Sequence, residues 1–250
     1  MSLLTVARDL QRRKARERSG RFVAEGVRTV EELLRSALTI DGILVAADVM
    51  TQPRVAALLT AAEARRVAVL PVTATEFDSA AGTEAPQGVL AVAISPVWTL
   101  ETLPSGPLRL LVLDALQDPG NVGTILRTAA AFDVTATISL PGTVDLWNAK
   151  VVRSAMGSHF VHPTITCTAA ALAPFLRDRG IPLWGADASG TPIRELVVPS
   201  QWALAVGNEG AGLSPATQPL VVQTVALPIA EAVESLNVAV ATGILLFALR

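Results

Sequence analysis

The stretch Leu110-Leu-Val-Leu-Asp-Ala-Leu-Gln-Asp-Pro-Gly-Asn-Val-Gly-Thr-Ile-Leu-Arg127 decides the fold class of this sequence. Its opening run at 110–113 is apolar, which is typical of a strand buried on both faces of a parallel sheet. The Asp-Pro-Gly at 118–120 predicts a turn, and Asn121 can cap a helix that carries Arg127. The helix turns by roughly 600° between these two residues, so both could address one site at its start. Alone, the pattern also fits a plain cap and a surface arginine.

Apolar runs of strand length recur towards the C-terminus, and the segments between them fit helices. The further strands are expected at residues 135–140, 182–186, 202–206 and 224–227. Strands that alternate with helices indicate a parallel sheet covered on both faces, with ligands bound at the carboxyl ends of the strands. A last helix is expected over residues 235–250, and because it is apolar almost all round it should be buried in a core or against another subunit.

The first hundred residues also alternate between the two patterns and predict a smaller α/β unit. Helices are expected at 5–19, 30–37 and 55–64, and strands at 22–24, 42–46, 67–71 and 88–94. The segment 95–107 interrupts this alternation with prolines and turn residues. These boundaries predict an amino-terminal domain at 1–97, a linker at 98–107 and a carboxyl-terminal domain at 108–250.

The composition favours a globular protein that stays in the cytoplasm. Of 250 residues, 51% are hydrophobic and 17% charged, with a formal net charge of -2. The longest apolar run, at 238–249, reaches about half of the roughly 20 residues that a membrane span needs, and the basic N-terminus does not resemble a secretory signal. Cys167, His159 and His162 are the sole cysteine and histidines, so we expect no internal disulfide and no metal site.

The net charge hides a basic amino-terminal segment. Residues 1–28 contain eight Lys and Arg against three Asp and Glu, while the remaining chain carries -7. Such a segment suggests contact with a polyanion, because Arg and Lys that neutralise phosphates supply non-specific nucleic-acid affinity. The alternative is a solvated helix face. The candidates for RNA contact are Arg8, Arg12, Arg13, Lys14, Arg16 and Arg18.

A second unusual loop, Gly207-Asn-Glu-Gly-Ala-Gly-Leu-Ser214, follows the strand expected at 202–206. Its glycines permit positive φ and close approach of a ligand or another segment. The spacing differs from the dinucleotide and P-loop fingerprints, and Glu209 would repel a phosphate. The alternatives are a ligand loop of another kind and a plain glycine-rich turn.

Three segments together resemble one known family. Asn121–Arg127, Gly207–Leu213 and the stretch 227–243, which contains Ser235 and Asn237, are similar to the three ordered motifs of the SpoU/TrmH RNA 2'-O-ribose methyltransferases of the SPOUT superfamily. The amino-terminal Phe22-Val-Ala-Glu-Gly26 and Thr83-Glu-Ala-Pro-Gln-Gly88, and the later Lys150-Val-Val-Arg-Ser-Ala-Met-Gly157, also resemble family segments.

This resemblance implies a fold, a cofactor and partners. The carboxyl-terminal domain would be a parallel-sheet SPOUT domain with a trefoil knot, joined to a ribosomal-protein-like α/β/α domain that binds RNA. S-adenosylmethionine would be the methyl donor, and the protein would be a homodimer with its active site near the subunit interface. Ribosomal RNA is favoured over transfer RNA as the substrate, by analogy of the amino-terminal domain.

The resemblance also assigns roles to single residues. Asn121, Arg127, Glu209, Ser235 and Asn237 would form the catalytic site, with Arg127 clamping a phosphate and stabilising the developing alkoxide, since an arginine is not deprotonated in proteins. The cofactor would contact Gly207, Asn208, Gly210, Gly212, Ile229, Leu236 and Ala239. Two rival functions remain. A Rossmann-type methyltransferase or nucleotide enzyme would share the α/β pattern, but its glycine fingerprint is missing from the loop after Leu113. The other rival is a non-catalytic RNA-binding or assembly protein that keeps the fold.

Overall fold

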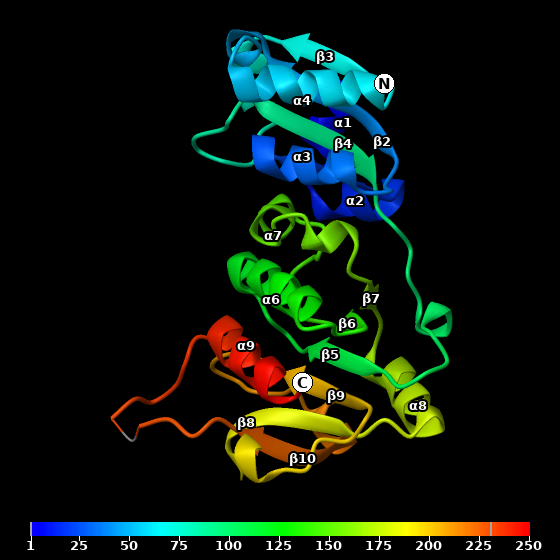
Figure 1. Ribbon diagram of the computed structural model, residues 1–250, viewed down its shortest axis with the longest axis vertical. Helices are drawn as coiled ribbons and strands as arrows, with labels where there is room; N and C mark the ends of the chain where they lie inside the picture. Colours follow the sequence, from blue (N-terminus) through cyan, green and yellow to red (C-terminus); the bar gives the residue numbers. More distant parts are fainter. Residues whose placement is uncertain (1, 231) are drawn as a thin grey trace. The chain divides into compact units, whose positions relative to one another are not determined.

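The chain forms two compact units, shown in the computed structural model of Figure 1, which describes every residue except Met1 and Glu231. The first unit comprises the chain up to Pro96 together with Asp145–Val161, and the second comprises Val97–Val144 with His162–Arg250. The division expected from sequence did not foresee that Asp145–Val161 packs with the amino-terminal unit.

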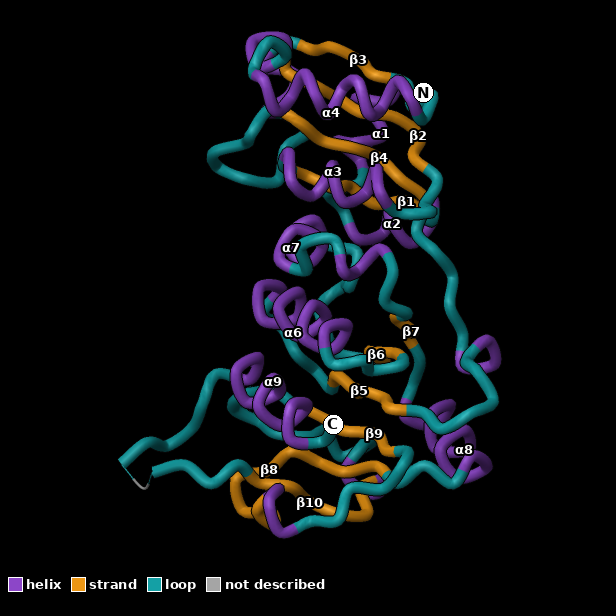
Figure 2. Tube along the Cα trace, viewed as in Figure 1, coloured by secondary structure: helices purple, strands orange, loops and turns teal. Residues whose placement is uncertain are grey.

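The first unit is built on a four-stranded sheet in the order β1-β4-β2-β3. The strands, drawn in orange in Figure 2, are β1 (Arg21–Glu25), β2 (Ile40–Ala46), β3 (Val69–Val72) and β4 (Val89–Ile94). The helices are α1 (Leu3–Asp9), α2 (Arg13–Ser19), α3 (Val27–Arg35), α4 (Pro53–Ala64), α5 (Ala74–Asp78) and α7 (Ala149–Ser154). Strands β2 and β3 are parallel, whereas β4 pairs antiparallel with both β1 and β2.

Helices cover both faces of this sheet. Since side chains alternate along a strand, Phe22 and Ala24 of β1 join the core under α3 and α4, while Val23 joins the core under α1 and α5. The expected α/β/α layering of the amino-terminal domain is therefore present.

The prediction of one helix over residues 5–19 is wrong, because the chain breaks into α1 and α2. Arg12 is the N-cap of α2 and is extended, with φ -92° and ψ 130°. Leu10 is buried against the sheet. Helix α2 then ends at Gly20, whose left-handed φ of 61° is a common way to terminate a helix.

The segment Asp145–Val161 is held to the first unit by aromatic packing. The Trp147 and Phe22 rings lie 4.5 Å apart between centroids, and Phe160 lies 5.8 Å from Phe22. Val152 is fully buried in the same core. Gly157 permits close packing on α3, since a Cβ there would lie 2.5 Å from the Cβ of Glu32.

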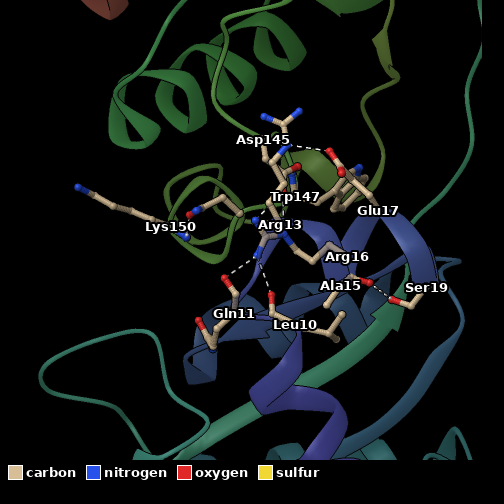
Figure 3. A network of polar contacts seen from close by, with 11 residues as sticks. Leu10, Gln11, Arg13, Ala15, Arg16, Glu17, Ser19, Asp145, Trp147 and Lys150 are labelled. Atoms are coloured by element: carbon tan, nitrogen blue, oxygen red, sulfur yellow. Dashed lines mark hydrogen bonds and ion pairs between the residues drawn. The ribbon is translucent and has the colours of Figure 1, made fainter.

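A buried ion pair fastens the same segment (Figure 3). The Arg16 guanidinium contacts Oδ2 of Asp145 through Nη2 at 2.6 Å and Nε at 2.7 Å. Its Nη1 donates to the carbonyls of Leu10 at 2.6 Å and Gln11 at 3.0 Å. These contacts engage all three nitrogen atoms of the guanidinium, and the side chain is only 7% exposed.

We expect Arg16→Ala to lower the free energy of unfolding of the first unit by about 3 kcal/mol, because it leaves Asp145 buried without its partner. The matched control is Arg13→Ala, which removes an exposed pair with Glu17 in the same helix and should cost about 0.5 kcal/mol or less. Urea denaturation of both variants measures this difference. Equal losses would show that the buried pair does not hold the segment in place.

The second unit contains the all-parallel sheet expected from the sequence, in the order β10-β8-β9-β5-β6-β7. Its strands are β5 (Arg109–Leu113), β6 (Ala136–Ser139), β7 (Thr164–Thr166), β8 (Leu183–Pro192), β9 (Trp202–Val206) and β10 (Val221–Ala226). Its helices are α6 (Pro119–Ala131), α8 (Ala169–Arg179) and α9 (Val238–Ala248). The short β7 was not predicted, and α9 begins at Val238 because Asn237 caps it.

Strand β5 is buried on both sides, as its apolar sequence predicts. Leu110 and Val112 belong to a core that includes Leu172 and Leu176 of α8. Leu111 and Leu113 alternate to the opposite face and are fully buried. Helices α6 and α9 pack against each other in this unit (Figure 1). None of the helices formed by the described residues has the length and apolar character that crossing a bilayer requires.

His162 is buried in the second unit, and burial lowers its pKa from 6.5 to about 4. Its Nε2 lies 2.8 Å from the Thr137 hydroxyl. The neutral ring is therefore the stable form in the folded protein.

We expect this histidine to reduce stability in mild acid. Because the unfolded chain takes up the proton at a higher pH than the folded protein, protonation favours unfolding. The free energy of unfolding should therefore keep its full value above pH 6.5 and fall by about 3 kcal/mol as the pH drops towards 4. Urea denaturation across this range, for wild type and His162→Gln, measures it. Parallel pH profiles for the two proteins would contradict the assignment.

Candidate active site

The site lies where the strand order of the second sheet reverses. The chain leaves β5 through α6 to reach β6 on one side, whereas β9 pairs with β5 on the other. Leu113 and Val206, the last residues of β5 and β9, are partners in register. The loops that follow these strands therefore start side by side, at the position where open α/β sheets bind ligands.

The loop after β5 is organised by two carboxylates. Asp114 is buried and accepts a hydrogen bond from the Ser214 amide at 2.7 Å, which connects it to the loop after β9. Asp118 is the N-cap of α6 and accepts from the Asn121 amide at 2.7 Å. The prediction that Asn121 caps this helix is thus wrong. With Asp118 in that role, the Asn121 side chain is left to make other contacts.

The Asn121 side chain connects three loops. Its Nδ2 donates to Oε1 of Glu209 at 2.7 Å, in the loop after β9. Its Oδ1 accepts from Nδ2 of Asn237 at 3.0 Å, in the loop after β10. Asn237 in turn caps α9, since its Oδ1 accepts from the amides of Ala239 and Val240. Three of the residues that the sequence assigned to catalysis thus form one continuous chain, here called the Asn121 chain.

The glycine-rich loop after β9 folds back on itself. The backbones of Asn208 and Gly212 exchange hydrogen bonds of 3.0 and 2.8 Å, and Oδ1 of Asn208 accepts from the Gly210 and Ala211 amides. A Cβ on Gly207 would lie 2.4 Å from the Gly212 backbone. Gly212 has φ of 68°, which favours glycine. These residues shape the loop and hold Glu209 on the exposed side.

Two cavities adjoin the Asn121 chain. The first has a volume of about 180 Å³ and is lined by Ala186, Asp187, Ala188, Val206, Gly207, Glu209, Val225, Leu227, Ile229, Glu234, Ser235, Leu236, Val238, Ala241, Thr242 and Leu245. The second has a volume of about 250 Å³ and is lined by Leu116, Gln117, Asp118, Asn121, Asn208, Glu209 and Val238. Glu209 and Val238 line both, so a ligand in one cavity would lie next to a ligand in the other.

The residues assigned to the cofactor fall into two groups. Gly207, Ile229 and Leu236 line the first cavity, together with Ser235 from the catalytic set. The others are not among the residues that line it: Asn208, Gly210, Gly212 and Ala239. Asn208 and Gly212 shape the loop, as described above. The Ala239 side chain is buried behind the helix start.

Sequence reasoning missed Asp187, which lines the first cavity just past the strand predicted at 182–186. Hydrogen bonds from the Ser189 hydroxyl at 2.6 Å and amide at 2.8 Å hold the pKa of this carboxyl below its usual value. The carboxylate is therefore ionised at neutral pH. The rule that ligands bind at carboxyl ends of parallel strands could have found it.

Arg127 is separated from this arrangement within its own chain. It is exposed on α6 and lines neither cavity. Around the helix axis it lies about 120° from Asn121. Among the described residues it has no ion-pair partner within 4.0 Å.

The amino-terminal basic residues differ in their availability. Arg8, Arg12, Arg13, Lys14 and Arg18 are exposed. The prediction that Arg16 contacts RNA is wrong. Arg16 is buried against Asp145, so it stabilises the first unit and is not available for RNA. Its position on the inner face of α2, next to Ala15, could not be distinguished from that of its neighbours by charge alone.

The described residues bring no three His, Cys, Asp or Glu side chains together in a way that could hold a metal ion. Burial raises the pKa of the Cys167 thiol to about 11, with a smaller contribution from Glu101. The groups that line the two cavities are carboxylates, amides, hydroxyls and apolar side chains.

This combination defines a class: an α/β protein with a two-chambered polar site at the switch point of an all-parallel sheet. Comparison with known proteins agrees with it. Residues 109–247 match the SpoU rRNA Methylase family, and residues 5–91 match the MRM3-like substrate binding domain. The chain belongs to the SpoU rRNA methylase family.

Relatives resemble the chain over nearly its whole length. It is 35% identical over 242 residues, 96% of this chain and 93% of the relative, to the 23S rRNA (guanosine(2553)-2'-O)-methyltransferase RlmP of Bacillus subtilis. Among solved structures, the AdoMet complex of AviRb from Streptomyces viridochromogenes matches with a TM-score of 0.89 at 26% identity, covering 100% of this chain and 97% of that one. An AdoMet-bound rRNA methyltransferase from Sinorhizobium meliloti matches with a TM-score of 0.85 at 28% identity, covering 100% and 96%.

We expect Gly207→Ala to destabilise the second unit by about 3 kcal/mol, because the new methyl group would overlap the Gly212 backbone. Gly210→Ala is the matched control: its nearest neighbour would be Oδ1 of Asn208 at 3.7 Å, so it should cost about 0.5 kcal/mol or less. Urea denaturation compares the two. A Gly207→Ala variant with the free energy of unfolding of the wild type would contradict the close approach of Gly207 to the Gly212 backbone.

Proposed function

We propose that this protein is an S-adenosylmethionine-dependent methyltransferase that modifies a ribose 2'-hydroxyl of ribosomal RNA. Family membership supports the chemistry, and a relative that carries the name of a 23S rRNA 2'-O-methyltransferase over nearly the full chain supports the substrate. The observation that carries the proposal is the Asn121 chain, which places polar groups from three loops between two adjoining cavities.

The first cavity fits a nucleoside-containing methyl donor. Ile229, Leu236 and Leu245 offer apolar walls for a base, and the carboxylates of Asp187 and Glu209 offer acceptors for hydroxyl or ammonium groups. When bound, S-adenosylmethionine supplies a methyl group on a positively charged sulfur. The apolar walls and the folded glycine-rich loop would exclude water from that group.

The second cavity fits the acceptor ribose. Asn121, Asn208 and Asp118 provide amide and carboxylate groups there, and Glu209 lies on the wall that it shares with the first cavity. The Asn121 amide is held by Glu209 and Asn237, so it is oriented before substrate arrives. Preorganised positioning of this kind supplies much of the acceleration of a transfer reaction.

The site would be completed in a homodimer. Val240, Ile244 and Phe247 are apolar and exposed on one side of α9, at spacings of three and four residues. A second copy that covers this face would bring a second α6 to the interface. Arg127 of one copy would then clamp an RNA phosphate and stabilise the developing alkoxide beside the Asn121 chain of the other. The proposal includes the trefoil knot within residues 108–250 and a cytoplasmic location.

The test is transfer of labelled methyl from S-adenosylmethionine to unmodified ribosomal and transfer RNA. We expect label in the ribosomal pool, and a loss of about 100-fold in kcat/KM for Arg127→Ala and for Asn121→Ala. Arg177→Ala, an exposed arginine of α8, is the control and should retain full activity. Label in transfer RNA alone would overturn the substrate class. Cofactor binding without label in either pool would favour the non-catalytic alternative.

Mixing inactive variants tests the shared site. In a mixed dimer of Arg127→Ala and Asn121→Ala, one site would contain both intact residues. Random exchange of subunits should therefore restore about a quarter of wild-type activity. Absence of any recovery, in mixtures shown to contain the mixed dimer, would place Arg127 in the site of its own chain.

A further inference from the structure

A separate cavity of about 550 Å³ lies in the first unit and plays no part in the site described above. It is lined by Glu25, Gly26, Arg28, Thr29, Arg54, Thr83, Ala85, Gln87, Arg153 and Met156. Three of these residues are arginines and one is a carboxylate, so the lining is positively charged. Concave surfaces rich in arginine are suited to anions such as phosphate, because each planar guanidinium can donate to two oxygen atoms at once.

The three arginines differ in whether they already form an ion pair. Arg54 forms a two-pronged pair with Glu31 at 2.7 and 2.8 Å, which lowers the pKa of that carboxyl. Among the described residues, neither Arg28 nor Arg153 has an ion-pair partner within 4.0 Å. These two guanidinium groups are available to a ligand.

The amino end of α3 opens on the same cavity. Gly26 is its N-cap and provides no side-chain cap. The Val27 amide is satisfied by Oε1 of Gln87 at 3.0 Å, while amides of the first turn have no partner within the helix. Thr29 is only 3% exposed, and no hydrogen-bond partner for its hydroxyl is found in the part of the chain that the structure describes. The Thr29 side chain, the amino end of α3 and the arginines thus line the same cavity, where an anion would meet helix amides and guanidinium groups.

The carboxylate of Glu25 lines the cavity and is hydrogen-bonded to the loop 82–83. It is buried, and it accepts hydrogen bonds from the Gly82 amide at 2.8 Å and from the Thr83 hydroxyl. Both of its oxygen atoms therefore accept hydrogen bonds from this loop. Glu25 thereby joins the two amino-terminal segments that resemble the family, at 22–26 and 83–88, and both contribute residues to the cavity.

Arg153 reaches the cavity from the segment that lies between β6 and β7 in the chain. Helix α7 packs on β1, and Gly157 lets the chain approach Glu32 of α3 closely. The buried Arg16–Asp145 pair fixes the start of the same segment. The carboxyl-terminal half of the sequence thus contributes an arginine to a site of the amino-terminal unit.

We propose that this cavity binds a backbone phosphate of the RNA substrate through Arg28, Arg153, the Thr29 hydroxyl and the first-turn amides of α3. The inference rests on the proposed function for the identity of the RNA. It assigns the main RNA contact of the amino-terminal unit to this cavity and not to the exposed arginines of α1 and α2.

The experiment measures the affinity of the full-length protein for an unmodified ribosomal RNA transcript over a series of KCl concentrations. Arg28→Ala and Arg153→Ala should each weaken binding about tenfold and reduce the slope of log affinity against log salt by about one. Thr29→Val, which removes only the hydroxyl, should weaken binding about threefold. Arg35→Ala, in the last turn of α3 and paired with Glu32, is the control and should match wild type.

Further arms separate the outcomes. Arg28→Lys and Arg153→Lys keep the charge, so they should retain the salt slope and serve where an alanine variant fails to fold. Affinities and slopes for Arg28→Ala and Arg153→Ala equal to those of Arg35→Ala would overturn the site. Binding of inorganic phosphate is measured by calorimetry. Variants that lose phosphate binding but keep full RNA affinity would also overturn the assignment of the site to RNA. A wild-type protein that methylates no RNA while these variants lose RNA affinity would refute the proposed function and leave this site standing.

Discussion

The position of the Asn121 side chain is the constraint on which the site depends. Its amide has one donor group, used by Glu209, and one acceptor, used by Asn237. Both bonds form only if the loops after β5, β9 and β10 converge, which requires β5 and β9 to be paired in parallel with their last residues in register. The apolar strands of the second sheet therefore determine the polar geometry at its edge.

The two units are not two consecutive halves of the chain, because residues 145–161 lie between two segments of the second unit and belong to the first. The segment Asp145–Val161 leaves β6, packs on the first unit through Trp147 and Asp145, and then returns to β7. A covalent insertion of this kind joins the units at two places besides the linker expected at 98–107. Substitutions in this segment should therefore affect the first unit, even though their sequence positions fall within the carboxyl-terminal domain expected at 108–250.

Sequence patterns predicted the sheet well because strand burial depends on local apolar runs. The run at 202–206 coincides with β9, and 110–113 falls within β5. Contacts between residues far apart in the chain were harder to predict from the sequence. The burial of Arg16 depends on Asp145, 129 residues away, and α2 offers no local signal for it. Asn121 was assigned to the helix cap because its residue type suits that position, yet Asp118 occupies the cap.

The two adjoining cavities would place a methyl donor beside a ribose hydroxyl. The most direct measurement is mass spectrometry of ribosomal RNA that has been incubated with the protein and S-adenosylmethionine and then digested to nucleosides. Fragmentation separates base from sugar. We expect the added methyl group to stay on the ribose fragment of a single nucleoside type. A methyl group on the base fragment would contradict this expectation.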